Sequence, residues 1–282
     1  MSLVSYVILL LAGSVGGLMA GLLGVGGGII FVPIITYVVE QWLPQSPHFT
    51  AIVMANSFMV ILALGLRASV KQRQLGMYYP RIVLATGLPA ILIALITSRF
   101  FVSSGAYSKR MFTLLFMGLL LFILYRFLRQ AWIEKVRVNK GGAIRAERSS
   151  ASYPLRSFVV PGLLSGLAAS LSGLGGGIIM IPYFTQVLRI PIQTATGLSL
   201  SIITLSAFPL VVFYLLQAPE ALTTSHVHTG YILWELSLPL MLGALIGVGP
   251  GINLSKKTGP LIIYLLLSLF VIITFTKMLL SL

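Results

Sequence analysis

The stretch that decides the fold is Gly24-Val-Gly-Gly-Gly-Ile-Ile-Phe-Val-Pro33, and it returns as Gly173-Leu-Gly-Gly-Gly-Ile-Ile-Met-Ile-Pro182. The two segments align without a gap and share seven of their ten residues. Each interrupts a long apolar run, although a glycine in a helix interior costs about 1 kcal/mol relative to alanine. We therefore expect a helix to break at the same point of two related halves, and we expect the break to serve a function.

The composition around the breaks is typical of a helical membrane protein. Hydrophobic residues make up 57% of the chain and charged residues 9%, whereas a soluble domain carries about 25% charged residues. Several apolar runs reach the roughly 20 residues that a membrane-spanning helix needs. The sequence therefore predicts an all-α integral membrane protein that crosses the lipid bilayer several times, in the inner (cytoplasmic) membrane of a cell.

A polar, basic segment divides the chain into two homologous repeats. Residues 1–128 form the first transmembrane repeat, residues 129–156 a cytosolic linker with little core of its own, and residues 157–282 the second repeat. We expect each repeat to contain a glycine-broken helical hairpin followed by three transmembrane helices. Paired internal repeats of this kind are a signature of secondary transporters.

The charges of equivalent loops predict that the repeats are inverted. Cytoplasmic loops collect Lys and Arg, and four such residues lie within the 67–81 loop, whereas its equivalent at 217–230 has none. Equivalent loops would then lie on opposite faces of the membrane. Arg99, Lys109 and Arg110 count against this topology, because it places them outside.

The glycine breaks themselves predict an anion site. The first N–H groups of a helix lack partners within the helix and lie at the positive end of its dipole, so two half-helix ends that meet near the midplane would bind an anion without a cationic side chain. The alternative is that the glycines only allow tight helix packing, although packing glycines usually come four apart. The candidate glycines are Gly26, Gly27, Gly28, Gly175, Gly176 and Gly177.

Hydroxyl and amide side chains near the breaks form a second group of candidates. They could complete the hydrogen bonds around an oxyanion, but helix-to-helix bonding or bonding to the i−4 carbonyl is an equally good interpretation for any one of them. The candidates are Asn56, Ser57, Ser172, Thr196, Ser199 and Ser201.

Other function classes find little support. The net charge of +14 collects at the ends of apolar runs and between residues 126 and 156, which indicates membrane topology and not nucleic-acid binding. The chain has no Cys, and His226 and His228 have no third ligand nearby, so we expect no metal and no cofactor. The residues around Ser199 lack the second glycine of the G-x-S-G elbow that an intramembrane serine protease needs, so we expect no catalytic residues and no enzyme. Glu235 is the one plausible embedded acid, and its place beside the interface favours snorkelling over a role in transport.

Two copies of an apolar G-x-G-G-G-I-I-x-x-P segment, one opening each half, resemble the sulfite exporter (TauE/SafE) family of permeases. The resemblance covers nearly the whole chain and extends to Ala195-Thr-Gly-Leu-Ser199, which is similar to the hydroxyl-rich helix start of the family. The first half departs from the pattern at Asn56, where a smaller or hydroxyl residue is commoner. The family implies transport of sulfite, sulfonates or related organosulfur acids.

The sequence thus predicts a membrane transporter whose partner is a small sulfur-containing oxyanion, bound near the midplane and moved by alternating access, with export as the expected direction. Two alternatives stay open: an anion channel with the same site, and an uptake permease for another organic or inorganic anion. The oligomeric state is not determined by these patterns.

Overall fold

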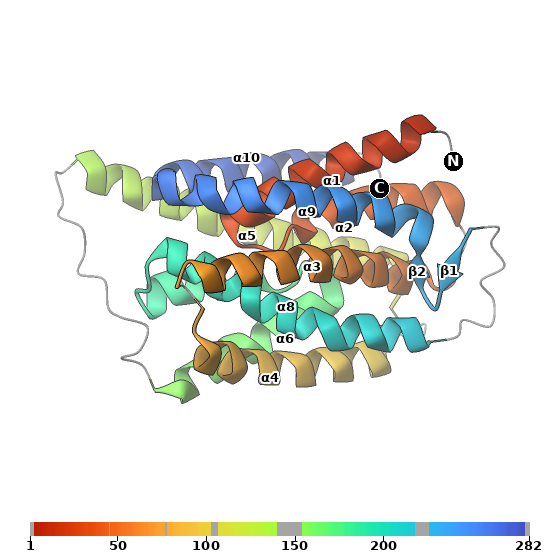
Figure 1. Ribbon diagram of the computed structural model, residues 1–282, viewed down its shortest axis with the longest axis horizontal. Helices are drawn as coiled ribbons and strands as arrows, with labels where there is room; N and C mark the ends of the chain where they lie inside the picture. Colours follow the sequence, from red (N-terminus) through yellow and green to blue (C-terminus); the bar gives the residue numbers. More distant parts are fainter. Residues whose placement is uncertain are drawn as a thin grey trace.

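The computed structural model describes residues 3–44, 46–76, 78–102, 107–139, 154–217 and 226–279. Within them the chain is helical apart from turns and one short β-hairpin (Figure 1). The elements of the first half are α1 (Leu3–Leu23), α2 (Gly28–Trp42), α3 (Phe49–Gln74), α4 (Pro80–Thr97), the π-turn η1 (Ser98–Val102) and α5 (Lys109–Asn139). Those of the second half are the 3₁₀ turn η3 (Leu155–Phe158), α6 (Val159–Ser172), α7 (Gly177–Pro182), the π-turn η4 (Tyr183–Val187), α8 (Ile192–Leu216), β1 (His228–Thr229), β2 (Ile232–Leu233), α9 (Trp234–Lys257) and α10 (Pro260–Leu279).

The expectation of a helical, multi-pass membrane protein is met. Seven of the described helices are long and apolar enough to cross a bilayer. Shorter apolar helices cover Gly28–Trp42, Gly177–Val187 and Leu261–Thr276. Many large apolar side chains on the outer helices are exposed, as expected of a surface that faces acyl chains.

Helix α5 extends into the segment predicted as the linker. Helix α5 continues to Asn139, eleven residues beyond 128, because the segment RQAWIEKVRVN is rich in good helix formers and contains neither Gly nor Pro. Residues 140–153 of the linker lie outside the described residues.

The two most buried spans, α3 and α8, form the centre of the bundle and run antiparallel. Of their most apolar windows, 78% and 67% are buried. Gly65 of α3 packs against Thr204 of α8, while Gly197 packs against Gln72, so that the start of one helix lies beside the end of the other. Both helices are apolar on nearly every side, as buried helices are.

Two pairs of helices approach each other through glycines, and each pair joins the two halves. A Cβ at Gly17 of α1 would overlap the main chain at Ala244 of α9, and one at Gly247 of α9 would overlap Ser14 of α1. In the same way, Gly166 of α6 packs on Ala90 of α4. Glycines spaced four apart thus let these backbones touch.

The bundle has two distinct ends (Figure 1). At the end that we call the linker end, α3 turns into α4, α5 finishes and α6 begins. At the opposite end, the hairpin end, lie β1, β2 and the start of α1. Helices α1 and α6 therefore enter the bundle from opposite ends.

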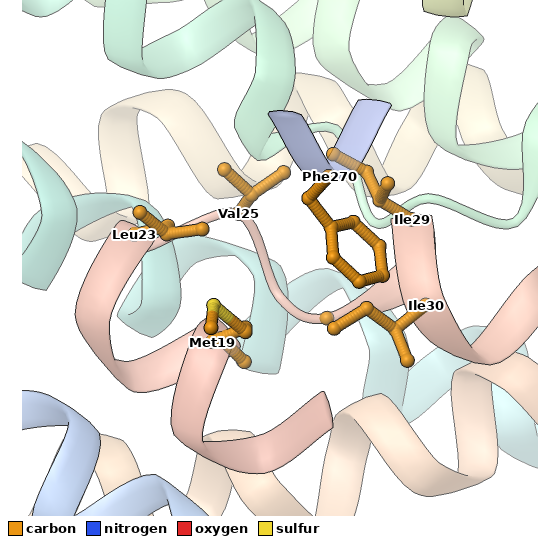
Figure 2. Close-up of a pocket in the computed structure, with 8 residues that line it drawn as sticks. Met19, Leu23, Val25, Ile29, Ile30 and Phe270 are labelled. Carbon is orange, nitrogen blue, oxygen red and sulfur yellow. The ribbon is translucent and has the colours of Figure 1, made fainter. Parts of the chain in front are cut away.

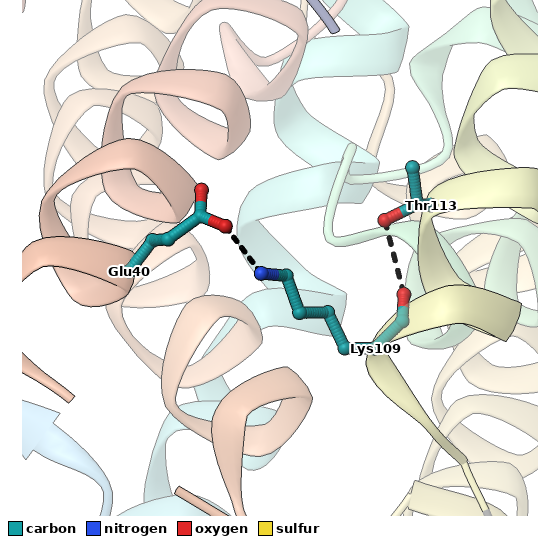
Figure 3. A network of polar contacts seen from close by, with 3 residues as sticks. All are labelled: Glu40, Lys109 and Thr113. Atoms are coloured by element: carbon teal, nitrogen blue, oxygen red, sulfur yellow. Dashed lines mark hydrogen bonds and ion pairs between the residues drawn. The ribbon is translucent and has the colours of Figure 1, made fainter. Parts of the chain in front are cut away.

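One of the cations that opposed the predicted topology is neutralised at the hairpin end. Lys109, at the start of α5, pairs with Glu40 near the end of α2, and Thr113 Oγ1 donates to the Lys109 carbonyl at 3.0 Å (Figure 3). The Lys109 ammonium also lies 5.1 Å from the centre of the Phe49 ring. A paired cation contributes little to the charge balance of its loop.

The glycine contact between α1 and α9 predicts an unequal response to one substitution. Gly17→Leu introduces a side chain where α9 leaves no room, and overpacking of this kind costs about 1–3 kcal/mol or more. Gly118→Leu on α5 is the matched control, since no atom lies within 4 Å of its added Cβ. We expect the thermal midpoint in detergent to fall for Gly17→Leu and to stay near that of the parent for Gly118→Leu. Equal midpoints would show that the contact is not tight.

Candidate functional site

The two glycine segments form turns with the same backbone conformation. In the first turn Gly24, Gly26 and Gly27 have φ angles of 72°, 80° and 74°. In the second turn the corresponding residues, Gly173, Gly175 and Gly176, have φ angles of 70°, 80° and 77°. Side chains with a Cβ rarely adopt this left-handed region. Each turn therefore requires its glycines for conformation as well as for space.

The two turns touch each other inside the bundle. A Cβ on Gly28 would lie 2.5 Å from Leu174 Cα, and one on Gly177 would lie 3.0 Å from the Gly24 carbonyl oxygen. Residues 20–32 and 172–178 are all buried. The structure therefore brings together the six candidate glycines, which lie 149 positions apart in the chain.

A helix begins at each turn and directs its first N–H groups toward the place where the two turns touch. We call this place the crossing. Gly27 and Gly176 occupy the N-cap positions of α2 and α7, and neither cap makes a side-chain hydrogen bond. The N–H groups of the first helical residues, such as Gly28 and Ile29, have no acceptor within their helix. Helix α7 is six residues long and continues as the π-turn η4. The crossing is thus a concentration of N–H donors and positive dipole ends.

Three of the candidate hydroxyl residues contact the crossing. Ser57 of α3 donates from Oγ to the Gly173 carbonyl at 2.8 Å, and the main chain at Thr196 of α8 packs against Gly24. Ser199 Oγ would lie 2.7 Å from a Cβ on Gly177. This hydroxyl is fully buried and has no hydrogen-bond partner among the described residues. Ser199 therefore has an unused donor at the start of α7.

The side-chain hydroxyls of Ser172, Ser201 and also Thr196 bond to their own helix or turn. Ser172 Oγ donates to the Ala168 carbonyl at 2.6 Å and accepts from the Leu174 N–H. Ser201 Oγ donates to the Gly197 carbonyl at 3.0 Å, and Thr196 Oγ1 to the Gln193 carbonyl at 2.8 Å. Their donor hydrogens are therefore already in use and are not available to an anion.

Asn56 lies on another face of α3 and holds the β-hairpin. Its Nδ2 donates to the carbonyls of Ile52 and Tyr231, at 2.7 and 3.0 Å. Its Oδ1 accepts from the Leu233 N–H at 2.9 Å and from Ser237 Oγ at 2.6 Å. Both donors and both lone pairs of the amide are used. None of these four hydrogen bonds is to a glycine turn.

The same hairpin collects the aromatic and ionisable groups of its end of the bundle. His226 Nδ1 lies 2.7 Å from Glu235 Oε2, and the His226 ring stacks on Trp42 at 4.1 Å. Glu235 is therefore paired at the hairpin end. Burial raises the pKa of the Tyr231 phenol, which stays protonated within 3.3 Å of His48 Nδ1.

Ile203 and Gln72 belong to this region, and sequence reasoning did not single them out. The Ile203 side chain would lie within 3.3 Å of a Cβ on Gly26, Gly175 or Gly177, so it fills the space between the two turns. The Gln72 amide is buried against Gly197, and its Oε1 has no partner among the described residues. Gln72 continues the buried face of α3 at helical spacing, which is the signal that could have found it. No pattern marks Ile203 among its apolar neighbours.

A small apolar cavity lies beside the first turn (Figure 2). Its volume is about 20 Å³, and its lining includes Met19, Leu23, Val25 and Phe270 (Figure 2). This is roughly the space of one water molecule, and the lining offers no donor for an anion. The cavity is therefore a packing defect behind the turn and not the candidate site.

Comparison with known proteins decides the family. The family described as Sulfite exporter TauE/SafE matches residues 9–278, nearly the whole chain. The chain belongs to the TauE/SafE family. This TauE/SafE protein is thus a member of a transporter family and not of an enzyme family, and it contains both glycine turns of the predicted motif.

The relatives of this TauE/SafE protein come from bacteria and an archaeon. It is 24% identical to the probable membrane transporter protein YunE of Bacillus subtilis, over 95% of this chain and 96% of that protein. It is 20% identical to the probable membrane transporter protein MJ0441 of Methanocaldococcus jannaschii, over 93% and 90% of the two chains. A probable membrane transporter protein of Haemophilus influenzae is 26% identical over 62% and 61%. No solved structure gives a significant match.

The contacts of Asn56 predict that its substitution by Ala destabilises the protein, unlike the same substitution at Ser201. Asn56→Ala leaves several buried groups of the hairpin without a partner, and each such group costs about 1–3 kcal/mol. Ser201→Ala is the control, because its hydroxyl bonds only to its own helix. We expect a large loss of thermal stability for Asn56→Ala and little change for Ser201→Ala. A stable Asn56→Ala protein would contradict the assigned role.

Proposed function

We propose that this TauE/SafE protein transports a small sulfur-containing oxyanion, such as sulfite or an organosulfonate, which binds where the two glycine turns cross. The observation that carries the proposal is the buried, unpartnered hydroxyl of Ser199 beside the start of α7. A buried polar group without a partner is costly, and an oxyanion would supply its acceptor. The sulfite exporter name of the family supports the substrate class.

The chemistry of the crossing suits an anion and disfavours a cation. Helix N-termini from α2 and α7 direct N–H donors and positive dipole ends at one region. The acidic residues placed by the structure lie elsewhere, with Glu40 and Glu235 at the hairpin end and Glu134 on α5. An oxyanion at the crossing would gain charge-assisted hydrogen bonds, which are about twice as strong as neutral ones.

Access to the site requires a conformational change. Ile203 fills the space between the turns, so the described conformation is closed around the crossing. The two turns are reached by helices that enter from opposite ends, α1 from the hairpin end and α6 from the linker end. Small movements of one hairpin against the other would open the crossing to one end at a time, which is the geometry of alternating access.

The two halves act, in this proposal, as inverted homologous repeats. Three observations support this: the equal φ angles of the two turns, the antiparallel α3 and α8, and the exchange of partners between halves. Hairpin helix α1 packs on α9, and the equivalent helix α6 packs on the equivalent α4. A two-fold relation in the membrane plane produces this exchange.

The membrane potential alone would suffice to drive export. Among the described residues no acid contacts the crossing, and Glu235 is paired with His226 at the hairpin end. A potential of 100 mV, negative inside, is worth about 2.3 kcal/mol per charge, or about 4.6 kcal/mol for a dianion. We therefore propose electrogenic export without a coupled proton. A channel with the same site differs from this carrier in showing flux that does not saturate.

The inverted arrangement predicts opposite labelling of two single cysteines. Gln74 ends α3 at the linker end, and Gln217 follows α8 at the hairpin end. The chain has no native Cys, so Gln74→Cys and Gln217→Cys can be tested directly; the Thr224 position, in the same 217–230 loop, lies outside the described residues. A membrane-impermeant maleimide should label one position in intact cells and the other in inverted vesicles. Labelling of both from the same side would exclude the inverted topology.

The site itself is tested by Ser199→Ala against Ser201→Ala in proteoliposomes. The Ser199 hydroxyl bonds to nothing described, so its removal should leave stability unchanged while weakening sulfite binding. A hydrogen bond to a charged group is worth about 1.5–3 kcal/mol, which corresponds to an increase of about ten- to hundredfold in the half-saturating concentration. Ser201→Ala, whose hydroxyl is satisfied by Gly197, should stay near the parent. Unchanged saturation in Ser199→Ala would refute the assigned site.

A further inference from the structure

Three cations come together where α3 and α9 approach the linker end. Lys71 of α3 donates from Nζ to the main-chain carbonyl of Gly249 at 2.6 Å. The Arg67 guanidinium, one turn earlier, lies 3.7 Å from the place where a Gly249 Cβ would stand. Arg67 and Lys256 of α9 lie near enough for their positive charges to act on Lys71. We call Arg67, Lys71 and Lys256 the basic cluster.

The elements that carry the basic cluster provide no carboxylate to neutralise it. Helix α3 contains neither Asp nor Glu. The acid of α9, Glu235, lies at the opposite end of that helix and pairs with His226. Glu134 is on α5, whose main helical partner is α10. Like charges repel one another, so an anion from outside these helices would stabilise the cluster.

With α3 centred in the bilayer, Lys71 lies at the boundary between acyl chains and headgroups, and Arg67 lies deeper. Helix α3 has 26 residues and is therefore about 39 Å long, somewhat more than the hydrocarbon thickness of about 30 Å. If its midpoint lies at the bilayer centre, Lys71 stands about 14 Å from the centre and Arg67 about 8 Å. The Arg67 side chain must then extend outward to place its charge at the level of the phosphates.

Apolar side chains beside the cluster are exposed on both helices. Leu66 and Val70 of α3 and Leu254 of α9 all present large apolar surface. Each lies within a few residues of a member of the cluster. The surface thus combines concentrated positive charge with apolar flanks, and a soluble oxyanion would use only the charge.

We propose that the basic cluster binds the phosphate headgroup of an anionic phospholipid, whose acyl chains lie over Leu66, Val70 and Leu254. The fork of the Arg67 guanidinium matches two phosphate oxygens, and the Lys ammonium groups add point charges. Gly249, which has no side chain, leaves the space between the cations open. Basic sites between transmembrane helices recognise anionic headgroups in this way. The inference is independent of the substrate proposed above.

Native mass spectrometry of the purified full chain in uncharged detergent tests this site. We titrate phosphatidylglycerol, phosphatidylcholine with the same acyl chains, and inorganic phosphate. Each basic residue near a lipid phosphate contributes a factor of about five in affinity. We expect the double variant Arg67→Gln, Lys71→Gln to bind phosphatidylglycerol about 25-fold more weakly. The control Arg73→Gln removes one charge from the same helix outside the cluster and should bind like the parent.

A third variant distinguishes loss of the lipid site from misfolding of the protein. Lys256→Gln leaves α3 and the bond from Lys71 to Gly249 intact, and it should weaken phosphatidylglycerol binding about fivefold. Equal lipid affinity in the parent, Lys256→Gln and the double variant would overturn the proposal. Binding of inorganic phosphate with no preference for phosphatidylglycerol over phosphatidylcholine would also overturn it, because the cluster would then be a site for a soluble anion.

Discussion

The architecture depends on the contact between two backbones at the centre of the bundle. The first turn and the second turn approach so closely that a Cβ on Gly28 or Gly177 would meet the other chain segment. Backbone without helical hydrogen bonds is tolerated at membrane depth only where protein or water surrounds it, and here protein surrounds it. Helices α3 and α8 enclose the crossing, and α1 and α6 deliver the turns from opposite ends.

Hydrogen bonding in the bundle leaves few donors free. Most buried hydroxyls, such as those of Ser201 and Thr204, donate to a carbonyl of their own helix, which is the cheapest way to satisfy them in an apolar environment. Asn56 uses its whole amide to fasten the hairpin. Against this background the Ser199 hydroxyl is exceptional among the candidates. Ser199 differs from the other candidate serines in that its hydroxyl has no hydrogen-bond partner among the described residues.

Much of this arrangement can be predicted from the sequence, and the missing parts have a common cause. The breaks at Gly24–Gly28 and Gly173–Gly177 follow from the cost of adjacent glycines in apolar runs, and the spans follow from hydropathy. No local sequence pattern of this kind shows which helices pack against each other. Asn56 was a candidate for binding the anion, because an amide can hydrogen-bond a ligand as well as the backbone of a hairpin. Ile203 fills the space between the two turns because of its position, and nothing in the sequence distinguishes it from the neighbouring apolar residues.

The pairing of α1 with α9 has a consequence for biogenesis. The glycine face of α1 is complete once residue 23 has been synthesised, but its partner begins at Trp234. At about 5–20 residues per second, the ribosome needs roughly 10 to 40 s to make the intervening chain. During that interval α1 stands in the bilayer with its small-residue stripe facing lipid or a membrane chaperone. The pairing of α1 is therefore completed late, when α9 has been made, and a truncation before α9 would leave α1 without this partner.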